Sequence, residues 1–457
     1  MVTAGFVAPY LLDTTMRFVE AAASLPDTRL ALITSEPEDR LPPGLRGRLA
    51  GHWRIDDPLD AGQIAWAVEG LGEQVGPVRR LLAVLEQLQV PLAQVREHLG
   101  IPGMDAATAR NFRDKDQMKT VLRAAGVPCA RHRLADSAAA AVGFAREVGF
   151  PLVVKPPAGA GAKSTFRLDS PGDLDAWLEV APPGPDRPAL IEEFLTGEEG
   201  SYDSVMIDGE IVWDSISNYL PTPLEVLRNP WMQWVVLLPR DINGPEYIGI
   251  RQVAPVALRA LGLRTGLTHM EWFRRPDGSV AVSEVGARPP GAQITSMLCY
   301  AHDFDLYRAW SQLMVDGTFS PPVRQWSTAT VYLRGQGVGH VRAVHGLDRL
   351  PPEVSSLVVD SRLPRPGQPS SGSYEGDGYI TVRHLDTEAV TAAVKHILTT
   401  VRVELGFLCE SSRYAKEHAV VAGLSPAPIT RAGPASTGGR PPWHPPQEGL
   451  HSRVGFA

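Results

Sequence analysis

Two glutamates on a predicted β-hairpin are the residues of this sequence best placed to do chemistry. In the run HMEWFRRPDGSVAVSEVGARPPG, two strand-like segments flank Asp277-Gly278, and Asp-Gly is a preferred two-residue hairpin turn. If these two residues form the turn, Glu271 and Glu284 face each other across the strands. Carboxylates about 5 Å apart repel each other, so we expect a divalent cation between them. Oxygen ligands of this kind suit Mg²⁺, which commonly bridges to nucleotide phosphates.

A solvated hairpin whose two glutamates splay into water is the alternative, and the chain contains a comparison that keeps it open. Asp208-Gly209 predicts a second hairpin, in which the same arithmetic places Asp203 opposite Asp214. Nothing around that second pair suggests a metal site. Pairing alone therefore leaves both metal binding and a plain hairpin open.

A small-residue loop after an apolar strand offers a place for phosphates. In GFPLVVKPPAGAGAKST the strand ends at Lys155, and a Gly/Ala-rich run leads to Lys163. Such a loop lets backbone N–H groups approach phosphate oxygens, and a lysine adds a point charge. The loop is not a Walker A motif, because Ala162 precedes Lys163 where that motif requires glycine. Because Lys155 would serve phosphates, we expect it to lack a buried acidic partner; an ordinary turn with a surface lysine is the alternative.

A third acidic segment, ALIEEFLTGEEGSYDSVMIDGEIV, predicts a strand followed by a hairpin. Its glutamates at positions 192, 193 and 199 are compatible with a solvated charge run. Only the order of this segment relative to the other two favours a functional role.

The elements that must position these residues follow from patterning along the chain. Residues 1–110 alternate short apolar runs with Ala/Leu-rich helical stretches, which is typical of α/β structure. No GxGxxG fingerprint occurs there. Residues 111–320 contain dense turn signals and short strands, and further strands and a helix are predicted up to position 422. The Pro/Gly/Ser-rich stretch 423–457 predicts a disordered tail.

Composition excludes several classes of protein. The 457 residues carry a net charge of -7 with no basic block, so neither a nucleic acid nor a membrane surface is an expected partner. Three widely spaced cysteines, Cys129, Cys299 and Cys409, argue against disulfides and zinc and favour a reducing cytoplasm. We expect no signal peptide and no membrane span.

In order and spacing, these motifs resemble the ATP-grasp superfamily over roughly residues 111–312, particularly carboxylate-amine ligases such as the bacterial L-amino acid ligases and D-alanine-D-alanine ligase. The resemblance implies an α/β (α+β) ATP-grasp fold. A Rossmann-like N-terminal domain would span residues 1–110, a lid subdomain 111–199, and a C-terminal domain with an extension 200–422, with ATP bound between the last two.

The resemblance also implies roles for individual residues. The residues near the nucleotide phosphates would be Lys115, Lys155 and the closing loop with Gly159, Gly161, Lys163 and Ser164. The residues around adenine and ribose would be Glu192 on the amino group, Glu193 and Leu195 through the backbone, and Glu199 on the ribose hydroxyls. The metal ligands would be Glu271 and Glu284. Arg288 would contact the transferred phosphoryl group, and with Lys155 and Lys163 it would be catalytic.

Two departures from the family pattern limit what the resemblance implies. Gly286 replaces a metal-binding asparagine, so one or two Mg²⁺ ions are expected, with Mn²⁺ as an alternative. His269 replaces the substrate arginine of D-alanine-D-alanine ligases, which argues against that substrate. Trp231 and Trp234 lie in an additional block and are candidates for a substrate pocket or for the core.

The implied reaction begins when a carboxylate attacks the γ-phosphate of ATP. An amine then displaces phosphate from the acyl phosphate, leaving ADP, phosphate and an amide. The partners would be a small-molecule carboxylate, such as an amino acid or peptide-like acid, and an amine. A kinase, a peptide-modifying ligase and a nucleotide-binding protein without turnover are the alternatives. The sequence leaves the oligomeric state open, with a homodimer as one candidate.

Overall fold

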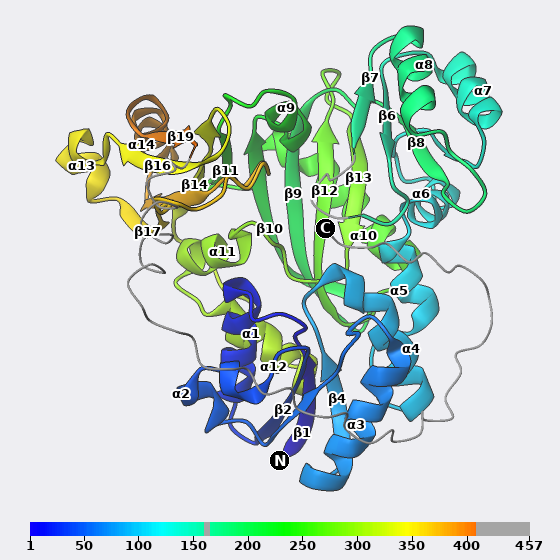
Figure 1. Cartoon of the computed structure of the whole chain (residues 1–457), viewed down its shortest axis with the longest axis vertical. Helices are drawn as coiled ribbons and strands as arrows, with labels where there is room; N and C mark the ends of the chain where they lie inside the picture. Colours follow the sequence, from blue (N-terminus) through cyan, green and yellow to red (C-terminus); the bar gives the residue numbers. More distant parts are fainter. Residues whose placement is uncertain (160–164, 408–457) are drawn as a thin grey trace, which may run out of the picture.

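The computed structural model describes residues 1–159 and 165–407. The loop residues Gly161, Lys163 and Ser164, together with Cys409 and the predicted tail 423–457, lie outside the described residues. The remaining chain forms four β-sheets with helices packed on them (Figure 1). None of the described helices combines the length and the apolar character needed to cross a membrane.

The N-terminal part is a parallel sheet between helices. Strands β1 (Val2–Val7), β2 (Thr28–Thr34), β3 (Gly51–Arg54) and β4 (Val78–Leu82) run in the order β3-β2-β1-β4. Its helices are α1 (Asp13–Ala23), α2 (Pro43–Arg46), α3 (Ala61–Val75) and α4 (Gln89–Leu99). Nearly continuous burial of β1 and β2 is expected of parallel strands covered on both faces. The predicted Rossmann-like α/β architecture is confirmed.

The second sheet forms a small lobe at one end of the molecule (Figure 1, upper right). After α5 (Ala106–Arg113) and α6 (Lys115–Ala124), strands β5 (His132–Ala135), β6 (Leu152–Lys155), β7 (Phe166–Leu168) and β8 (Ala189–Glu193) pair antiparallel in the order β5-β8-β6-β7. Helices α7 (Ala138–Val148) and α8 (Pro171–Val180) pack with this sheet.

The largest sheet has eight strands in the order β13-β12-β9-β10-β11-β14-β18-β17. These are β9 (Glu198–Ile207), β10 (Glu210–Leu220), β11 (Trp234–Leu238), β12 (Gly266–Arg274), β13 (Val280–Gly286), β14 (Ser327–Leu333), β17 (Val358–Arg362) and β18 (Gly378–His384). The accompanying helices are α9 (Pro223–Arg228), α10 (Ile248–Leu261), α11 (Ile294–His302), α12 (Leu306–Asp316), α13 (Pro352–Ser355) and α14 (Thr387–Thr400). A three-stranded sheet of β15 (Gly335–Gln336), β16 (His340–His345) and β19 (Arg402–Gly406) completes the extension.

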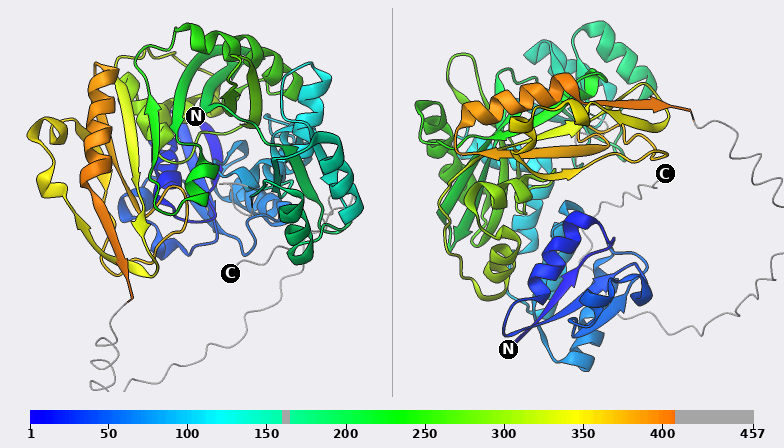
Figure 2. Two further views of the ribbon diagram at one scale, coloured as in Figure 1. Left: turned by 90° about the horizontal axis from the view of Figure 1, so that it is seen from above. Right: turned by 90° about the vertical axis from the view of Figure 1, so that its left-hand side faces the viewer.

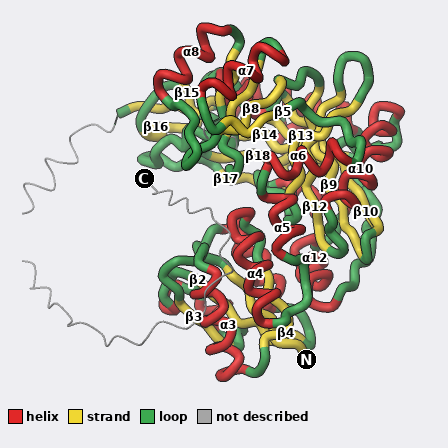
Figure 3. The backbone as a smooth tube through the Cα atoms, turned by 90° about the vertical axis from the view of Figure 1, so that its right-hand side faces the viewer, coloured by secondary structure: helices red, strands yellow, loops and turns green. Residues whose placement is uncertain are grey.

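Helix α1 of the N-terminal part packs against helix α12, and the side views show the N-terminal part below the large sheet (Figure 2, right; Figure 3). Phe18 of α1 packs edge-on against Tyr307 and Trp310 of α12, with ring centroids 4.6 and 5.0 Å apart. One continuous apolar core therefore joins the two parts, and residues of the N-terminal part are held in fixed positions beside the large sheet.

Candidate functional site

The β12–β13 hairpin places Glu271 directly opposite Glu284, as predicted. The predicted two-residue turn is wrong, because Arg275 N–H bonds Ser279 O at 2.8 Å and three residues form the loop, with Gly278 at a φ of 83°. A β-bulge then leaves Ser283 without a partner between the pairs Glu271–Glu284 and Trp272–Val282. The longer loop and the bulge each shift the register by one residue, and the two shifts cancel.

In the comparison hairpin at Asp208-Gly209, the predicted turn is right and the predicted cross-strand pair is wrong. Its Asp208-Gly209 turn has two residues, with φ angles of 53° and 89°, as predicted. A bulge at Val212, however, moves Asp203 opposite Ser215, so the predicted Asp203–Asp214 pair is wrong. A bulge depends on tertiary packing and cannot be read from the turn residues.

Two lysines one turn apart on helix α6 reach into the hairpin. The Asp114 side chain caps the helix by accepting from the backbone N–H of residues 116 and 117, which sets its first turn beside β13. Lys115 Nζ lies 2.6 Å from Glu284 Oε1 and also donates to Gly159 O at 3.0 Å. Lys119 Nζ donates to the carbonyl of the bulged Ser283 at 2.8 Å. The bulge thus supplies an acceptor for a buried lysine.

Glu192 of β8 joins the small lobe to this cluster. Its carboxylate lies 3.3 Å from Lys119 Nζ and 2.9 Å from Lys155 Nζ. The expectation that Lys155 has no buried acidic partner is therefore wrong, because antiparallel pairing of β6 with β8 brings the two side chains together. Sequence reasoning also missed Lys119, although its i, i+4 spacing from Lys115 was a usable signal.

The charged groups of this cluster compensate one another, although burial lowers the pKa of Lys119 despite its pairing with Glu192. Burial raises the pKa of Glu192, but the charges of Lys119 and Lys155 outweigh it and lower that pKa overall. Burial likewise opposes ionisation of Glu284, yet Lys115 brings its pKa down to about 2. The cluster therefore presents cationic groups held in place by carboxylates, which is a preorganised site for an anion such as a phosphate chain.

Glu271 forms no ion pair with a lysine or arginine among the described residues. Among the described residues, no lysine or arginine lies within 4.0 Å of it, and the nearest basic group is His269 Nε2 at 3.9 Å. Burial, together with the charge of Glu284, raises the pKa of Glu271. Burial and the Glu271 charge also hold the pKa of Glu199 well above its usual value.

The carboxylates fit a divalent cation by their chemistry. Across residues 1–159 and 165–407, no three His, Cys, Asp or Glu side chains alone form a metal-binding group. A Mg²⁺ ion commonly uses one or two carboxylates and completes its coordination with phosphate oxygens and water, which this donor set allows.

His269, on the same face of β12 as Glu271, is fixed by a buried aspartate. Its Nδ1 lies 2.6 Å from Asp203 Oδ1, and Asp203 accepts a second bond from the Ser201 hydroxyl at 2.9 Å. Burial lowers the pKa of His269, but Asp203 outweighs burial and raises it overall. Tyr219 Oη is 3.4 Å from Nε2.

Arg288 follows β13 and is held by a residue from the N-terminal part. Glu86, in the single turn Glu86–Leu88, lies 2.9 Å from the Arg288 guanidinium and 3.2 Å from that of Arg113. Arg113 also donates to Gly159 O at 3.4 Å. The sequence offered no signal for Glu86, because only docking of the N-terminal part brings it to Arg288.

Other predicted residues lie at the edge of the cluster or outside it. The Glu193 carboxylate is 3.1 Å from Arg131 Nε, and Leu195 is buried beside Ala281. Trp234 is a core residue that stacks on Tyr332 at 4.7 Å, whereas Trp231 is 62% exposed.

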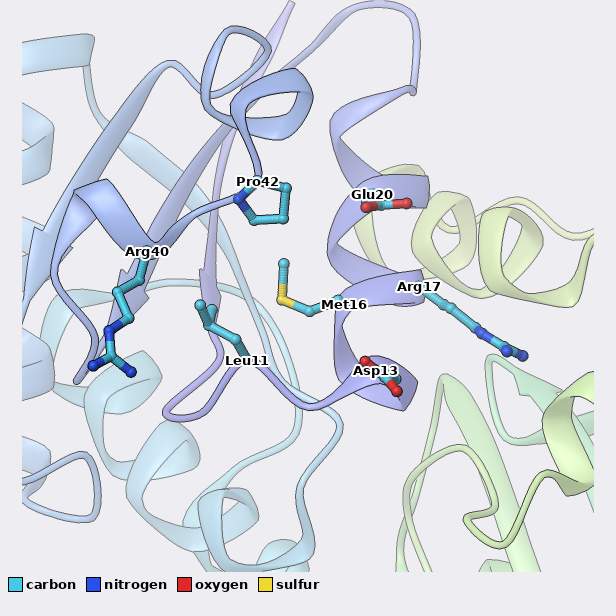
Figure 4. Close-up of a pocket in the computed structure, with 7 residues that line it drawn as sticks. All are labelled: Leu11, Asp13, Met16, Arg17, Glu20, Arg40 and Pro42. Atoms are coloured by element: carbon cyan, nitrogen blue, oxygen red, sulfur yellow. The ribbon is translucent and has the colours of Figure 1, made fainter. Parts of the chain in front are cut away.

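A separate hollow of about 420 Å³ lies on the N-terminal part and contains none of the predicted site residues. Figure 4 shows it between α1 and the segment around Arg40 and Pro42, with Arg17 pointing away from the other side chains. Arg17 reaches Ser296 of α11 at 2.6 Å and so helps dock the N-terminal part.

Curated proteins similar in sequence include the following two, while no family model matches the chain. The uncharacterized protein y4rH of Sinorhizobium fredii is 28% identical over 305 residues, which cover 65% of this chain and 62% of that protein. The L-arginine-specific L-amino acid ligase of Bacillus subtilis is 27% identical over 233 residues, covering 49% and 55% respectively. The matched region thus spans less than two thirds of each relative.

Solved structures match over most of the chain. The L-amino acid ligase of Bacillus licheniformis superposes with a TM-score of 0.70 at 18% identity, covering 89% of this chain and 99% of that one. Carboxyaminoimidazole ribonucleotide synthase of Aspergillus clavatus, solved with ATP, gives 0.63 at 16% identity, covering 87% and 97%.

Proposed function

Because this chain has the ATP-grasp fold, we propose that it is an ATP-dependent ligase that joins a carboxylate to an amine through an acyl phosphate. ADP and phosphate would be released. The observation that carries the proposal is the set of cations around the opposed pair Glu271–Glu284. Lys115 pairs with Glu284 directly. Lys155 and Arg288 pair with Glu192 and Glu86, and their charges also act on the two opposed glutamates.

The relatives support this choice of reaction within the fold. One curated relative and one solved structure are L-amino acid ligases, and another solved structure contains ATP. An amino acid or a peptide-like acid is therefore the proposed carboxylate, and a second amino compound is the proposed acceptor.

The residues of the cluster suit phosphoryl transfer between two small molecules. Lys115 and Lys155 would neutralise the phosphate chain, and Arg288 would stabilise negative charge on the transferred group. A bound Mg²⁺ would offset charge on the γ-phosphate, with Glu271 and Glu284 as its protein ligands. No protein nucleophile is needed, because the substrate carboxylate itself attacks and catalysis consists of positioning and charge stabilisation.

The remaining assignments are part of the same proposal. We assign the adenine and ribose contacts to Glu192, Glu193, Leu195 and Glu199. The phosphate loop comprises Gly159, Gly161, Lys163 and Ser164. In the structure the Glu192 carboxylate is engaged by two lysines, so a contact to the adenine amino group competes with those ion pairs.

The test is to trap the activated acid. Purified protein with Mg²⁺ and ATP is screened for phosphate release against pairs of amino acids, and hydroxylamine is added to productive mixtures. A hydroxamate that the amine substrate suppresses is the expected result. A phosphorylated product that resists hydroxylamine would establish a kinase instead, and absence of ATP turnover with every pair would favour a nucleotide-binding protein.

A further inference from the structure

The imidazole of His269 has one nitrogen committed and one nitrogen available. The Asp203 carboxylate, fully buried, holds Nδ1 at 2.6 Å, so Nε2 is the nitrogen that faces the site. The contact of Nε2 with Tyr219 Oη, at 3.4 Å, is long for a hydrogen bond. Nε2 therefore lacks a strong partner among the described residues.

The strand register directs Nε2 toward the Glu271 carboxylate. His269 and Glu271 are two residues apart on β12, so their side chains share one face of the sheet. The cross-strand partner of His269 is Gly286, and the Arg288 side chain lies 3.6 Å from the position that a Cβ would take there. Nε2 approaches Glu271 Oε1 to 3.9 Å.

This separation is too long for a hydrogen bond, so Nε2 and the Glu271 carboxylate are near each other without being bonded to each other. Ligand atoms about 2.1 Å from an octahedral ion are about 3.0 Å apart when adjacent and about 4.2 Å apart when opposite. The observed 3.9 Å equals neither spacing, so the Glu271 side chain would have to rotate for both atoms to bind one ion. A carboxylate behind the far nitrogen is also the arrangement that orients histidine ligands in metal sites.

We infer that His269 is a metal ligand, and that its Nε2 and the Glu271 carboxylate together bind the divalent cation of the nucleotide site. Asp203 is then a positioning residue that fixes the imidazole. Because imidazole nitrogen prefers transition metals to Mg²⁺, the site should bind Mn²⁺ more tightly than Mg²⁺. The inference rests on the proposed function in one respect, because the bound nucleotide supplies the remaining ligands of the cation.

The decisive experiment detects the nitrogen directly and needs no variant. Full-length protein is loaded with Mn²⁺ and ADP, and electron spin echo envelope modulation of the bound Mn²⁺ is recorded for unlabelled protein and for protein labelled with [¹⁵N]histidine. Modulation that changes from ¹⁴N to ¹⁵N on labelling is the expected result. Bound Mn²⁺ without histidine modulation would overturn the inference, as would failure of Mn²⁺ to bind in the presence of ADP.

Variants then identify which histidine is responsible. His269→Gln should lose the modulation and weaken Mn²⁺ binding about tenfold or more, with a smaller change for Mg²⁺. Asp203→Asn should weaken Mn²⁺ binding about tenfold while keeping some modulation. His345→Gln is the matched control, since that histidine also pairs with a carboxylate, Glu404, at 2.7 Å but lies outside the site. Equal losses for Mn²⁺ and Mg²⁺ in His269→Gln would indicate a merely structural histidine.

The outcomes separate this inference from the ligase proposal. Hydroxamate formation without histidine modulation would leave the ligase proposal standing and refute the metal ligand. Histidine modulation without turnover of any substrate pair would support the metal ligand and contradict the ligase proposal.

Discussion

Lys119→Met should destabilise the protein because it removes a buried charge. The expected loss of unfolding free energy follows from the contacts of Lys119. The lysine side chain is 1% exposed, pairs with Glu192 and donates to Ser283 O. Removing one member of a buried ion pair costs about 3–5 kcal/mol, and an unpaired buried carbonyl costs about 1–3 kcal/mol. Because Lys155 still pairs with Glu192, we expect the cost of breaking the ion pair to be reduced. The total loss of unfolding free energy should then be about 3 kcal/mol.

Thermal unfolding measures this loss. For a unit of 150–250 residues, 1 kcal/mol shifts Tm by about 2–4 °C, so the unfolding transition that includes helix α6 should fall by about 6–12 °C. Lys395→Met is the matched control, because Lys395 is exposed on helix α14 and its removal should cost less than about 0.5 kcal/mol.

A double variant tests the physical cause. Glu192→Gln removes the carboxylate that Lys119→Met leaves undercompensated, so the two changes together should cost less than the sum of the single costs. Strict additivity, or a Lys119→Met shift no larger than that of Lys395→Met, would refute the argument that this ion pair organises the site.

Three further predictions concern the same cluster. Lys155→Ala should weaken nucleotide binding, measured by titration with ATP, and should lower Tm less than Lys119→Met, since Lys155 makes no backbone contact among the described residues comparable with that of Lys119 to Ser283; an equal or larger drop would make Lys155 chiefly structural. Glu284→Gln should reduce hydroxamate formation by orders of magnitude with ATP binding less affected; a wild-type rate would show that Glu284 holds no catalytic metal. The lowered pKa of Glu192 contributes stability that is present above its ordinary value of 4.5 and is lost as pH falls below it, so the stability difference between wild type and Glu192→Gln should shrink in acid urea titrations; a difference constant with pH would contradict this.

The order of motifs along the chain was sufficient to predict the fold. Apolar periodicity indicated the α/β N-terminal part, and the motif series indicated the ATP-grasp arrangement, because these signals depend on local propensity and spacing. The facing pair Glu271–Glu284 was also predicted correctly, although through a loop length that was wrong and a bulge that compensated for it.

Contacts between distant segments could not be predicted in the same way. The sequence gives no local trace of Glu86 beside Arg288, of Lys119 and Lys155 sharing Glu192, or of Asp203 behind His269. Each of these pairs arises where separate elements pack, and each charge is tolerated in the interior only because the packed partner offsets its loss of hydration. Residue types and their order along the chain thus indicated the proposed chemistry, whereas the pairing of charges in the candidate site emerged only when the small lobe, the large sheet and the N-terminal part came together.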